Sequence, residues 1–325
     1  MAVRQRKELD PIKPYIFGRS IKSAEDELGK RKRIIKLVAN ENNFGISDKV
    51  VPEIEKRSAE IIRYPDPTNS IVLERLTKKY GVAEENLIFS NGSFEMISII
   101  AQTYLEPGDE VIMQDPTFGW YANASLQAGA KLVKIRVDDE GLAGIDKIFE
   151  AVNEKTKIIW FCNPNNPTGT AVDQKTLISL LERLPSTVLF VLDEAYVDFA
   201  DPGYGLNSVE LIKKYDNVIS LHTFSKLYGL ASFRLGFAYA DAEIIRQLYR
   251  VRQPFNINLP AQIAAAVSLD DEGFIRKVLE GYSDARAQYY RVLDRLGLHY
   301  WDSQANFIMF DTGFNSDEIV KEFFE

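Results

Sequence analysis

The sequence predicts an α/β protein with a mostly parallel central sheet and a smaller α+β domain built from both chain ends. Between residues 86 and 240, short β-branched and aromatic runs alternate with helical patterns. These runs are almost continuously apolar, which is typical of parallel strands that helices cover on both faces. From about Glu243 the pattern changes to long helices and then to a strand-like run, NFIMF (306–310).

The expected elements follow in chain order. The expected strands are NLIFS (86–90), EVIMQ (110–114), KLVKIRV (131–137), KIIWFC (157–162), TVLFVLD (187–193), NVISLHT (217–223) and RLGFAYA (234–240). Helical periodicity lies between several of them, at 93–105, 173–184 and 208–215. We therefore expect a large domain over 45–255 and a small domain formed by 1–44 and 256–325.

Composition limits the class of function. The 325 residues are 46% hydrophobic, which is enough for one large core or two moderate ones. A net charge of −8 without a long basic stripe disfavours a nucleic-acid partner. No apolar stretch is long enough to span a membrane and the N-terminus lacks the apolar core of a signal peptide, so we expect no membrane partner and a cytoplasmic location.

Cysteine and histidine usage excludes further chemistry. Cys162 is the only cysteine, so neither a disulfide framework nor a thiolate metal site is expected. His222 and His299 are the only histidines, and neither lies in a metal-binding or triad motif. We therefore interpret both as structural histidines and expect no metal.

Chemically useful residues follow the predicted strands. NGSFE (91–95) places a glycine before a helix, which suits either an anion site or a plain N-cap. Phe118, Asn166, Asp193 and Lys226 each follow a different strand. Because ligands of parallel sheets bind at the carboxyl ends of the strands, these side chains are expected to share one site. Together they suit a flat, phosphorylated, electron-withdrawing cofactor held covalently by the lysine.

The chain also resembles the fold-type I pyridoxal-phosphate aminotransferases, and among them the histidinol-phosphate aminotransferase branch. The similarity runs from about Pro14 to Phe310. It is carried by LVANENNFGIS (37–47), YPDP (64–67), NPNNPTG (163–169), DEAYVDF (193–199) and TFSKLYGLASFRLG (223–236). The resemblance implies pyridoxal 5′-phosphate as cofactor, an amino donor and a 2-oxo acid acceptor as substrates, and a homodimer with shared active sites.

The resemblance also implies catalytic roles. Lys226 is expected to bind the cofactor covalently and to move the substrate proton, since an amine in a low-dielectric site near other cations loses its own proton readily. Asp193 is expected to pair with the pyridine nitrogen. Tyr196 and Asn166 are expected to bind the phenolic oxygen, and Phe118 to stack on the ring.

The remaining expected cofactor contacts surround the phosphate. They are the loop and backbone amides of Gly92, Ser93 and Phe94, the hydroxyls of Thr223 and Ser225, the guanidinium of Arg234, and Tyr64 from the neighbouring subunit. Tyr15 and Asn40 are expected to contact the substrate.

The chain departs from the family pattern in three places. Phe94 stands where the family has an acidic residue, and Phe17 replaces a proline in PYIFG (14–18). The family's substrate-binding arginines follow a segment similar to EIVKEFFE (318–325), so we expect that the C-terminal part of the small domain is incomplete. Arg250 and Arg252 are candidates for holding a substrate phosphate, with surface or dimer charges as the alternative reading.

The resulting prediction is a histidinol-phosphate:2-oxoglutarate aminotransferase of histidine biosynthesis. An aromatic amino-acid aminotransferase or a phospho-amino-acid decarboxylase on the same scaffold stays open, as does a non-catalytic regulator that binds the cofactor. An unrelated nucleotide-binding protein is disfavoured, because no Gly-rich nucleotide fingerprint is present.

Overall fold

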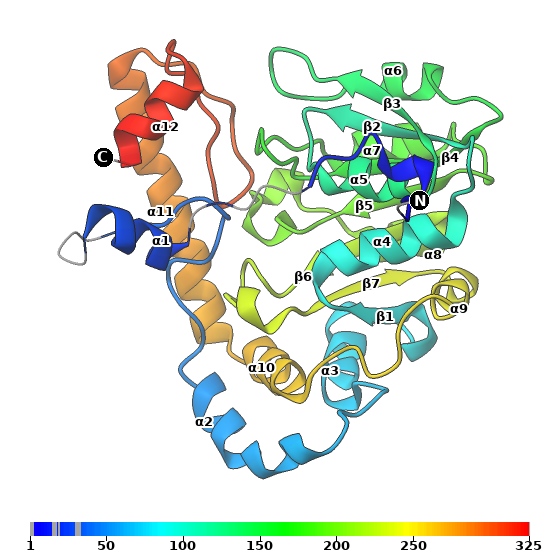
Figure 1. The fold of residues 1–325 in the computed structure, drawn as a ribbon, viewed down its shortest axis with the longest axis horizontal. Coiled ribbons are helices and arrows are strands. Elements are labelled where there is room, and N and C mark those ends of the chain that lie inside the picture. Colours follow the sequence, from blue (N-terminus) through cyan, green and yellow to red (C-terminus); the bar gives the residue numbers. More distant parts are fainter. Residues whose placement is uncertain (1–2, 15–17, 19, 30–33, 325) are drawn as a thin grey trace.

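The computed structural model describes residues 3–14, 18, 20–29 and 34–324. Within this part of the chain, seven strands form one twisted sheet (Figure 1). The strands are β1 (Leu87–Ser90), β2 (Glu110–Asp115), β3 (Lys131–Arg136), β4 (Thr156–Cys162), β5 (Leu189–Asp193), β6 (Val218–Thr223) and β7 (Gly236–Ala240). The seven predicted strands between 86 and 240 are confirmed, with bounds that differ by two residues or fewer.

The helices that the structure describes fill the connections and the two ends of the chain. They are α1 (Ile21–Leu28), α2 (Val50–Lys56), α3 (Ser70–Tyr80), α4 (Gly92–Tyr104), α5 (Trp120–Gln127), α6 (Ile145–Glu150), α7 (Gln174–Leu181), α8 (Ser208–Lys214), α9 (Ala242–Leu248), α10 (Leu259–Leu269), α11 (Glu272–Leu296) and α12 (Ser316–Phe324). Short 3-10 turns include η2 (Ser58–Ile62), η4 (Val197–Phe199) and η6 (Ala231–Phe233). Among the described residues, no helix is both long enough and apolar enough to span a membrane.

The strand order is β1-β7-β6-β5-β4-β2-β3, and β7 alone among these strands runs antiparallel to its neighbours. The mostly parallel sheet is therefore confirmed. Because β1, β4, β5 and β6 point the same way, their carboxyl ends lie along one edge. β7 begins at that edge, where Gly236 pairs with both Ser90 and Thr223.

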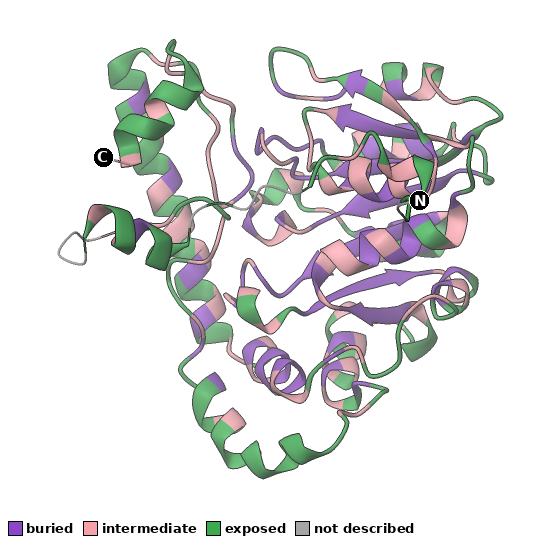
Figure 2. Cartoon of the chain, in the orientation of Figure 1, coloured by how far each residue is buried: buried purple, intermediate pink, exposed green. Residues whose placement is uncertain are grey.

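Side chains alternate between two apolar layers, as a strand period of two requires. On one face, strand residues pack against α4, α5 and α9. On the other, they pack against α3, α6, α7, α8 and α10. Both faces are covered, and the central strands are buried along their length (purple in Figure 2). Side chains at successive strand positions therefore face different helix layers, which matters for the ends of β5 and β6.

Residues 41–44, which follow α1 in the chain, pack against α11 beside the sheet, whereas the first described residues lie near α5 (Figure 1). Phe44 packs edge-on against Tyr282 of α11, and the Tyr282 hydroxyl donates to the Glu41 carbonyl at 3.1 Å. This contact agrees with a small domain built from both ends, while the domain bounds of 45–255, 1–44 and 256–325 remain predictions.

The predicted strand at 306–310 is wrong. This segment forms only an isolated antiparallel bridge, between Tyr300 and Phe310. A strand is stable only when neighbouring strands satisfy its backbone groups and cover its faces. Beside 306–310 the described chain provides that single bridge and no neighbouring strand, so the apolar run alone was a misleading signal.

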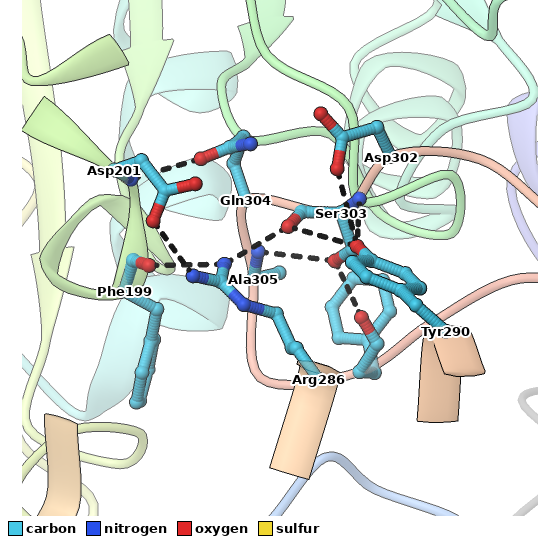
Figure 3. Close-up of polar contacts among 9 residues, drawn as sticks. Phe199, Asp201, Arg286, Tyr290, Asp302, Ser303, Gln304 and Ala305 are labelled. Carbon is cyan, nitrogen blue, oxygen red and sulfur yellow. Dashed lines mark hydrogen bonds and ion pairs between the residues drawn. The ribbon is translucent and has the colours of Figure 1, made fainter. Parts of the chain in front are cut away.

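Arg286 links α11 to the loop that follows η4 and to the segment around Ser303 (Figure 3). Its guanidinium donates to the carbonyls of Phe199 (3.1 Å) and Ser303 (2.9 Å), and to the carboxylate of Asp201 (2.9 Å). Tyr290, one turn along α11, accepts a hydrogen bond from the Ser303 amide at 2.8 Å. One buried side chain thus joins three segments that are distant in the sequence.

Replacing Arg286 with leucine is expected to lower the free energy of unfolding by about 2–4 kcal/mol, because two buried carbonyls lose their donor. Urea unfolding followed by circular dichroism measures this loss. Arg295, exposed on the same helix, is the matched control, and its replacement with leucine is expected to change stability by less than about 0.5 kcal/mol. Equal effects of the two changes would show that the Arg286 contacts contribute nothing specific.

Candidate active site

A cavity of about 210 Å³ lies at the shared edge where the parallel strands end. Nearly all the predicted cofactor residues line it, although they come from segments spread over more than 140 positions. Those lining residues are Ser93, Phe94, Phe118, Asn166, Asp193, Tyr196, Thr223, Ser225, Lys226 and Arg234. The structure therefore brings these residues together around one cavity.

Part of the cavity lining has the chemistry to bind an anion. Arg234 follows η6 in a left-handed conformation (φ 57°), and its guanidinium lies over Gly92 at the start of α4. A Cβ added at Gly92 would lie 2.5 Å from the Arg234 Nη2 atom, so a side chain there would displace the guanidinium. The first amide groups of a helix have no partner within the helix and attract negative charge.

Two hydroxyls, those of Thr223 and Ser225, also line the cavity. Thr223 Oγ1 and Ser225 Oγ are 3.0 Å apart, and the Ser225 amide donates to Thr223 Oγ1 at 3.1 Å. The turn after β6 thus holds both hydroxyls at the cavity wall. A guanidinium, two hydroxyls and a helix N-terminus together match the acceptor oxygens of a phosphate group.

Asp193 also lines the cavity and is buried, with an exposed fraction of 3%. The Tyr121 hydroxyl donates to its Oδ2 atom at 2.6 Å, and the Ala195 amide donates to Oδ1 at 3.1 Å. Burial raises the pKa of Asp193, and these two donors act in the opposite direction. Each carboxylate oxygen keeps a lone pair, so Asp193 can still accept a hydrogen bond from a ligand.

Lys226 projects into the cavity from the turn after β6. Its Nζ donates to the carbonyls of Ala39 (2.9 Å) and Asn40 (3.2 Å) and lies 5.4 Å from the centre of the Tyr196 ring. Burial lowers the pKa of Lys226 to about 8, with Arg234 acting in the same direction and Glu41 opposing it. A lysine with this pKa has an appreciable neutral, nucleophilic fraction near neutral pH.

The Tyr196 hydroxyl is held by two amide side chains. Asn40 donates to it at 3.3 Å and Asn166 at 3.2 Å. Burial raises the pKa of Tyr196, so the phenol stays protonated and can donate onward. Asn166 lies in the NPNNPTG turn, where Asn163 also bonds the Val172 backbone and fixes the loop. The turn thus aims one amide at the cavity, as the sequence predicted.

A second cavity of about 620 Å³ adjoins the first and shares Glu41 and Asn166 with it. Its lining is mainly apolar and aromatic, with Leu37, Phe44, Tyr289, Phe307 and Phe310 among the contributors. Asn40, the predicted substrate residue, lines this second cavity. Lys36 is also there, and its ammonium pairs with Glu41 at 2.7 Å.

Tyr64 and Arg252 line neither cavity of their own chain. Tyr64 is 83% exposed and stacks on Phe255, with ring centres 5.0 Å apart, outside the cavity of its own chain. Tyr15 lies outside the described residues. Arg252 lines neither cavity, and its Nε donates to the Phe89 carbonyl at 2.8 Å, so the structure gives it a role at the end of β1.

Six lining residues were not predicted from the sequence, and two of these, Tyr121 and Glu41, bring a hydroxyl and a carboxylate to the cavity. Tyr121 follows Phe118 by three positions, a spacing that places both on one face of the turn leading into α5. That spacing was a usable signal. Glu41 gave no comparable signal, because only the fold brings its segment to Lys226.

These observations fit pyridoxal phosphate. The cavity lining provides a group of phosphate-type donors, a buried carboxylate that can hold a ring N–H, a phenol, an amide and a primary amine of lowered pKa. Phe118 contributes an aromatic face at the wall.

Comparisons with known proteins agree with this fit. The family model described as aminotransferase class I and II matches residues 32–324. A histidinol-phosphate aminotransferase of Moorella thermoacetica is 41% identical over 323 residues, covering 98% of this chain and 82% of the relative. One from Geobacillus sp. (strain WCH70) is 40% identical over 318 residues, covering 98% of this chain and 87% of the relative.

The fold of this chain is also similar to that of a solved structure. The crystal structure of histidinol-phosphate aminotransferase from Sinorhizobium meliloti, in complex with pyridoxal-5′-phosphate, aligns with a TM-score of 0.88 at 25% identity. The alignment covers 97% of this chain and 84% of that chain.

Proposed function

This chain belongs to the class I and II aminotransferases, which work with pyridoxal 5′-phosphate, and from that premise we propose that it transfers the amino group of histidinol phosphate to 2-oxoglutarate. The observation that carries the substrate assignment is that relatives about 40% identical over nearly the whole chain bear the name histidinol-phosphate aminotransferase. The cavity supports the reaction type, since it joins a nucleophilic lysine to a buried carboxylate.

The chain's own residues would hold the cofactor at three places. The phosphate would lie against the amides of Ser93 and Phe94, the hydroxyls of Thr223 and Ser225, and the Arg234 guanidinium. Asp193, oriented by Tyr121, would bind the ring nitrogen. Asn166 and Tyr196 would bind the phenolic oxygen, and Phe118 would cover one ring face.

When bound, pyridoxal phosphate supplies a covalent attachment for the amino group and an electron-withdrawing ring that stabilises negative charge on the adjacent carbon. Lys226 would first hold the cofactor and then, as a neutral amine, accept the proton that leaves the substrate carbon. Asp193, as an anion, would keep the ring nitrogen protonated. Tyr196 would fix the ring orientation through its bonds to Asn40 and Asn166.

A second candidate substrate class is supported by the second cavity. Its aromatic lining would also suit an unphosphorylated aromatic amino acid, whereas a phosphate there needs a cation, because burying an unpaired phosphate is costly. Lys36 lines this cavity, and its ammonium could bind a substrate phosphate if its ion pair with Glu41 broke. The two substrates thus differ in their need for Lys36.

The substrate is tested by comparing kcat/KM for histidinol phosphate, phenylalanine and tyrosine with 2-oxoglutarate as acceptor. We expect histidinol phosphate to be preferred by more than about tenfold, which corresponds to about 1.4 kcal/mol of transition-state stabilisation. A preference of that size for either aromatic amino acid would reject histidinol phosphate and favour the aromatic aminotransferase.

We also infer a homodimer with shared sites. Val51, Ile61, Ile62, Tyr64 and Phe255 are exposed apolar or aromatic side chains, and the segment from α2 to η2 that carries three of them is mostly exposed (green in Figure 2). An exposed apolar surface of this kind suits a protein interface. Tyr64 would then reach the cofactor phosphate of the partner subunit.

Removing the Tyr64 hydroxyl with Tyr64→Phe is expected to weaken cofactor binding about 10- to 100-fold, the usual effect of losing a hydrogen bond to a charged group. A Lys226→Ala variant is expected to be inactive. At limiting cofactor, mixing the two variants should raise activity, because a hybrid dimer contains one site with both native residues. A fully active monomer in sedimentation velocity, or no gain on mixing after subunit exchange is demonstrated, would contradict shared sites.

A further inference from the structure

A buried polar cluster lies directly behind the candidate site, on the opposite face of the sheet. Glu194 follows Asp193 at the end of β5, and His222 precedes Thr223 at the end of β6. Because side chains alternate along a strand, Glu194 and His222 face the α3 and α10 layer, whereas Asp193 and Thr223 face the cavity. Glu194 is 1% exposed and His222 is 6% exposed.

Ser220 links the two side chains. Its hydroxyl donates to Glu194 Oε2 and lies 2.8 Å from His222 Nε2. Since the serine has one hydrogen and gives it to the carboxylate, Nε2 must carry the hydrogen shared with Ser220 Oγ. His222 Nε2 is itself 3.3 Å from Glu194 Oε2.

The imidazole is fixed in orientation. It packs nearly parallel against Phe237 and Tyr239, two neighbouring rings on β7, with ring centres 4.9 and 5.0 Å away and interplanar angles of 12° and 16°. Tyr80 packs against it at 5.7 Å. These ring contacts hold the imidazole with Nε2 directed towards Ser220 and Glu194.

Other charged and titratable groups surround the pair. Asp198 and Lys79 lie near His222, and Lys79 Nζ donates to the Tyr228 hydroxyl at 2.7 Å. Burial raises the pKa of Asp198, and Lys79 lowers it more than His222 does. Tyr80, Tyr228 and Tyr239 have raised pKa values because of burial and stay neutral. The positive charge of Lys79 thus mainly stabilises the Asp198 carboxylate. His222 is left as the cationic partner of Glu194.

Glu194 depends on that partner. Its Oε1 atom has no hydrogen-bond partner among the described residues. A buried carboxylate that lacks a cationic partner is strongly destabilising and takes up a proton or disturbs its neighbours. Its nearest carboxyl neighbour along the chain is Asp193.

We propose that His222 is a positioning residue of the aminotransferase reaction: as an imidazolium it balances Glu194, so that the adjoining Asp193 stays an anion facing the cofactor. The two charges have opposite effects on Asp193, as this proposal requires: Glu194 raises the pKa of Asp193 and His222 lowers it. The inference rests on the proposed role of Asp193 as partner of the ring nitrogen.

The test replaces His222 with glutamine, which can still bond to Ser220 but carries no charge. In the holoenzyme, we expect the cofactor dissociation constant to rise and the rate of substrate α-proton loss to fall, each by about tenfold, the equivalent of one pKa unit at Asp193. KM should change little, and the pH at which the cofactor absorption changes should move. The double variant His222→Gln/Glu194→Gln removes both charges and should recover these losses to within about threefold.

Ser220→Ala separates charge from bonding geometry. It deletes the bridging hydroxyl and keeps both charges, so cofactor affinity and the absorption titration should stay within about twofold of the native enzyme. A loss in Ser220→Ala as large as in His222→Gln, or no recovery in the double variant, would overturn charge balance in favour of a purely structural bridge. If His222→Gln does not fold, Ser220→Ala still decides between the two.

Two controls separate this inference from the site assignment. His299→Gln changes the other, exposed histidine and should leave the cofactor dissociation constant, the rate of α-proton loss, KM and the absorption titration unchanged. Asp193→Asn should produce a larger loss than His222→Gln. If Asp193→Asn has no effect, the proposed site fails; if it has its effect and His222→Gln matches His299→Gln, only the role of His222 fails.

Discussion

Replacing Lys226 with alanine is expected to lower transaminase turnover by about four orders of magnitude, because one side chain provides both the covalent anchor and the proton acceptor. Borohydride treatment of the native enzyme should attach the cofactor irreversibly to Lys226 and abolish the visible absorption band. In the apoenzyme, the pKa of about 8 of the free Lys226 amine makes attachment of the cofactor dependent on pH. The neutral fraction of the amine rises from about one tenth at pH 7 to about nine tenths at pH 9.

Cofactor uptake by the apoenzyme should therefore be faster at pH 9 than at pH 7, as followed by stopped-flow absorbance. Peptide mapping of the borohydride-treated protein identifies the modified lysine. Lys131→Ala, at an exposed position on β3, is the matched control and should retain full activity. An adduct found on any lysine other than Lys226 would reject the assignment of the anchor.

Much of the sheet and the cofactor-binding half of the site could be predicted from the sequence, for a simple physical reason. Apolar runs such as KIIWFC and TVLFVLD mark buried parallel strands, and parallel strands bring their carboxyl ends together. Asp193, Thr223 and Lys226 therefore meet because of where they stand relative to strand ends. No knowledge of helix packing was needed to bring them together.

Contacts that depend on packing between layers were not predictable. The Tyr121 bond to Asp193 requires α5 to settle on the sheet with one phenol reaching the end of β5. The failed strand at 306–310 shows the same limit, since an apolar run becomes a strand only beside a partner. His222 looked like an ordinary core histidine, and only the fold brings Ser220 and Glu194 to its Nε2 atom.

The second large effect is expected at Asp193. Its replacement with asparagine should slow removal of the substrate α-proton roughly 100- to 1,000-fold, because a neutral amide cannot hold a protonated ring nitrogen as a buried carboxylate does. The fold should survive, since asparagine can still accept from the Ala195 amide and pair with the Tyr121 hydroxyl.

Loss of α-deuterium from labelled substrate, followed by NMR, measures the Asp193 effect apart from product release. Burial holds the pKa of Asp193 above its ordinary value in the cofactor-free protein, so cofactor binding by the apoenzyme should weaken on acidification at a higher pH than an exposed aspartate would give. This weakening on acidification should vanish in Asp193→Asn. Tyr121→Phe removes a donor that favours the anion, so it should move the weakening to still higher pH. An Asp193→Asn enzyme that exchanges deuterium at the native rate would show that the ring nitrogen is held by another group.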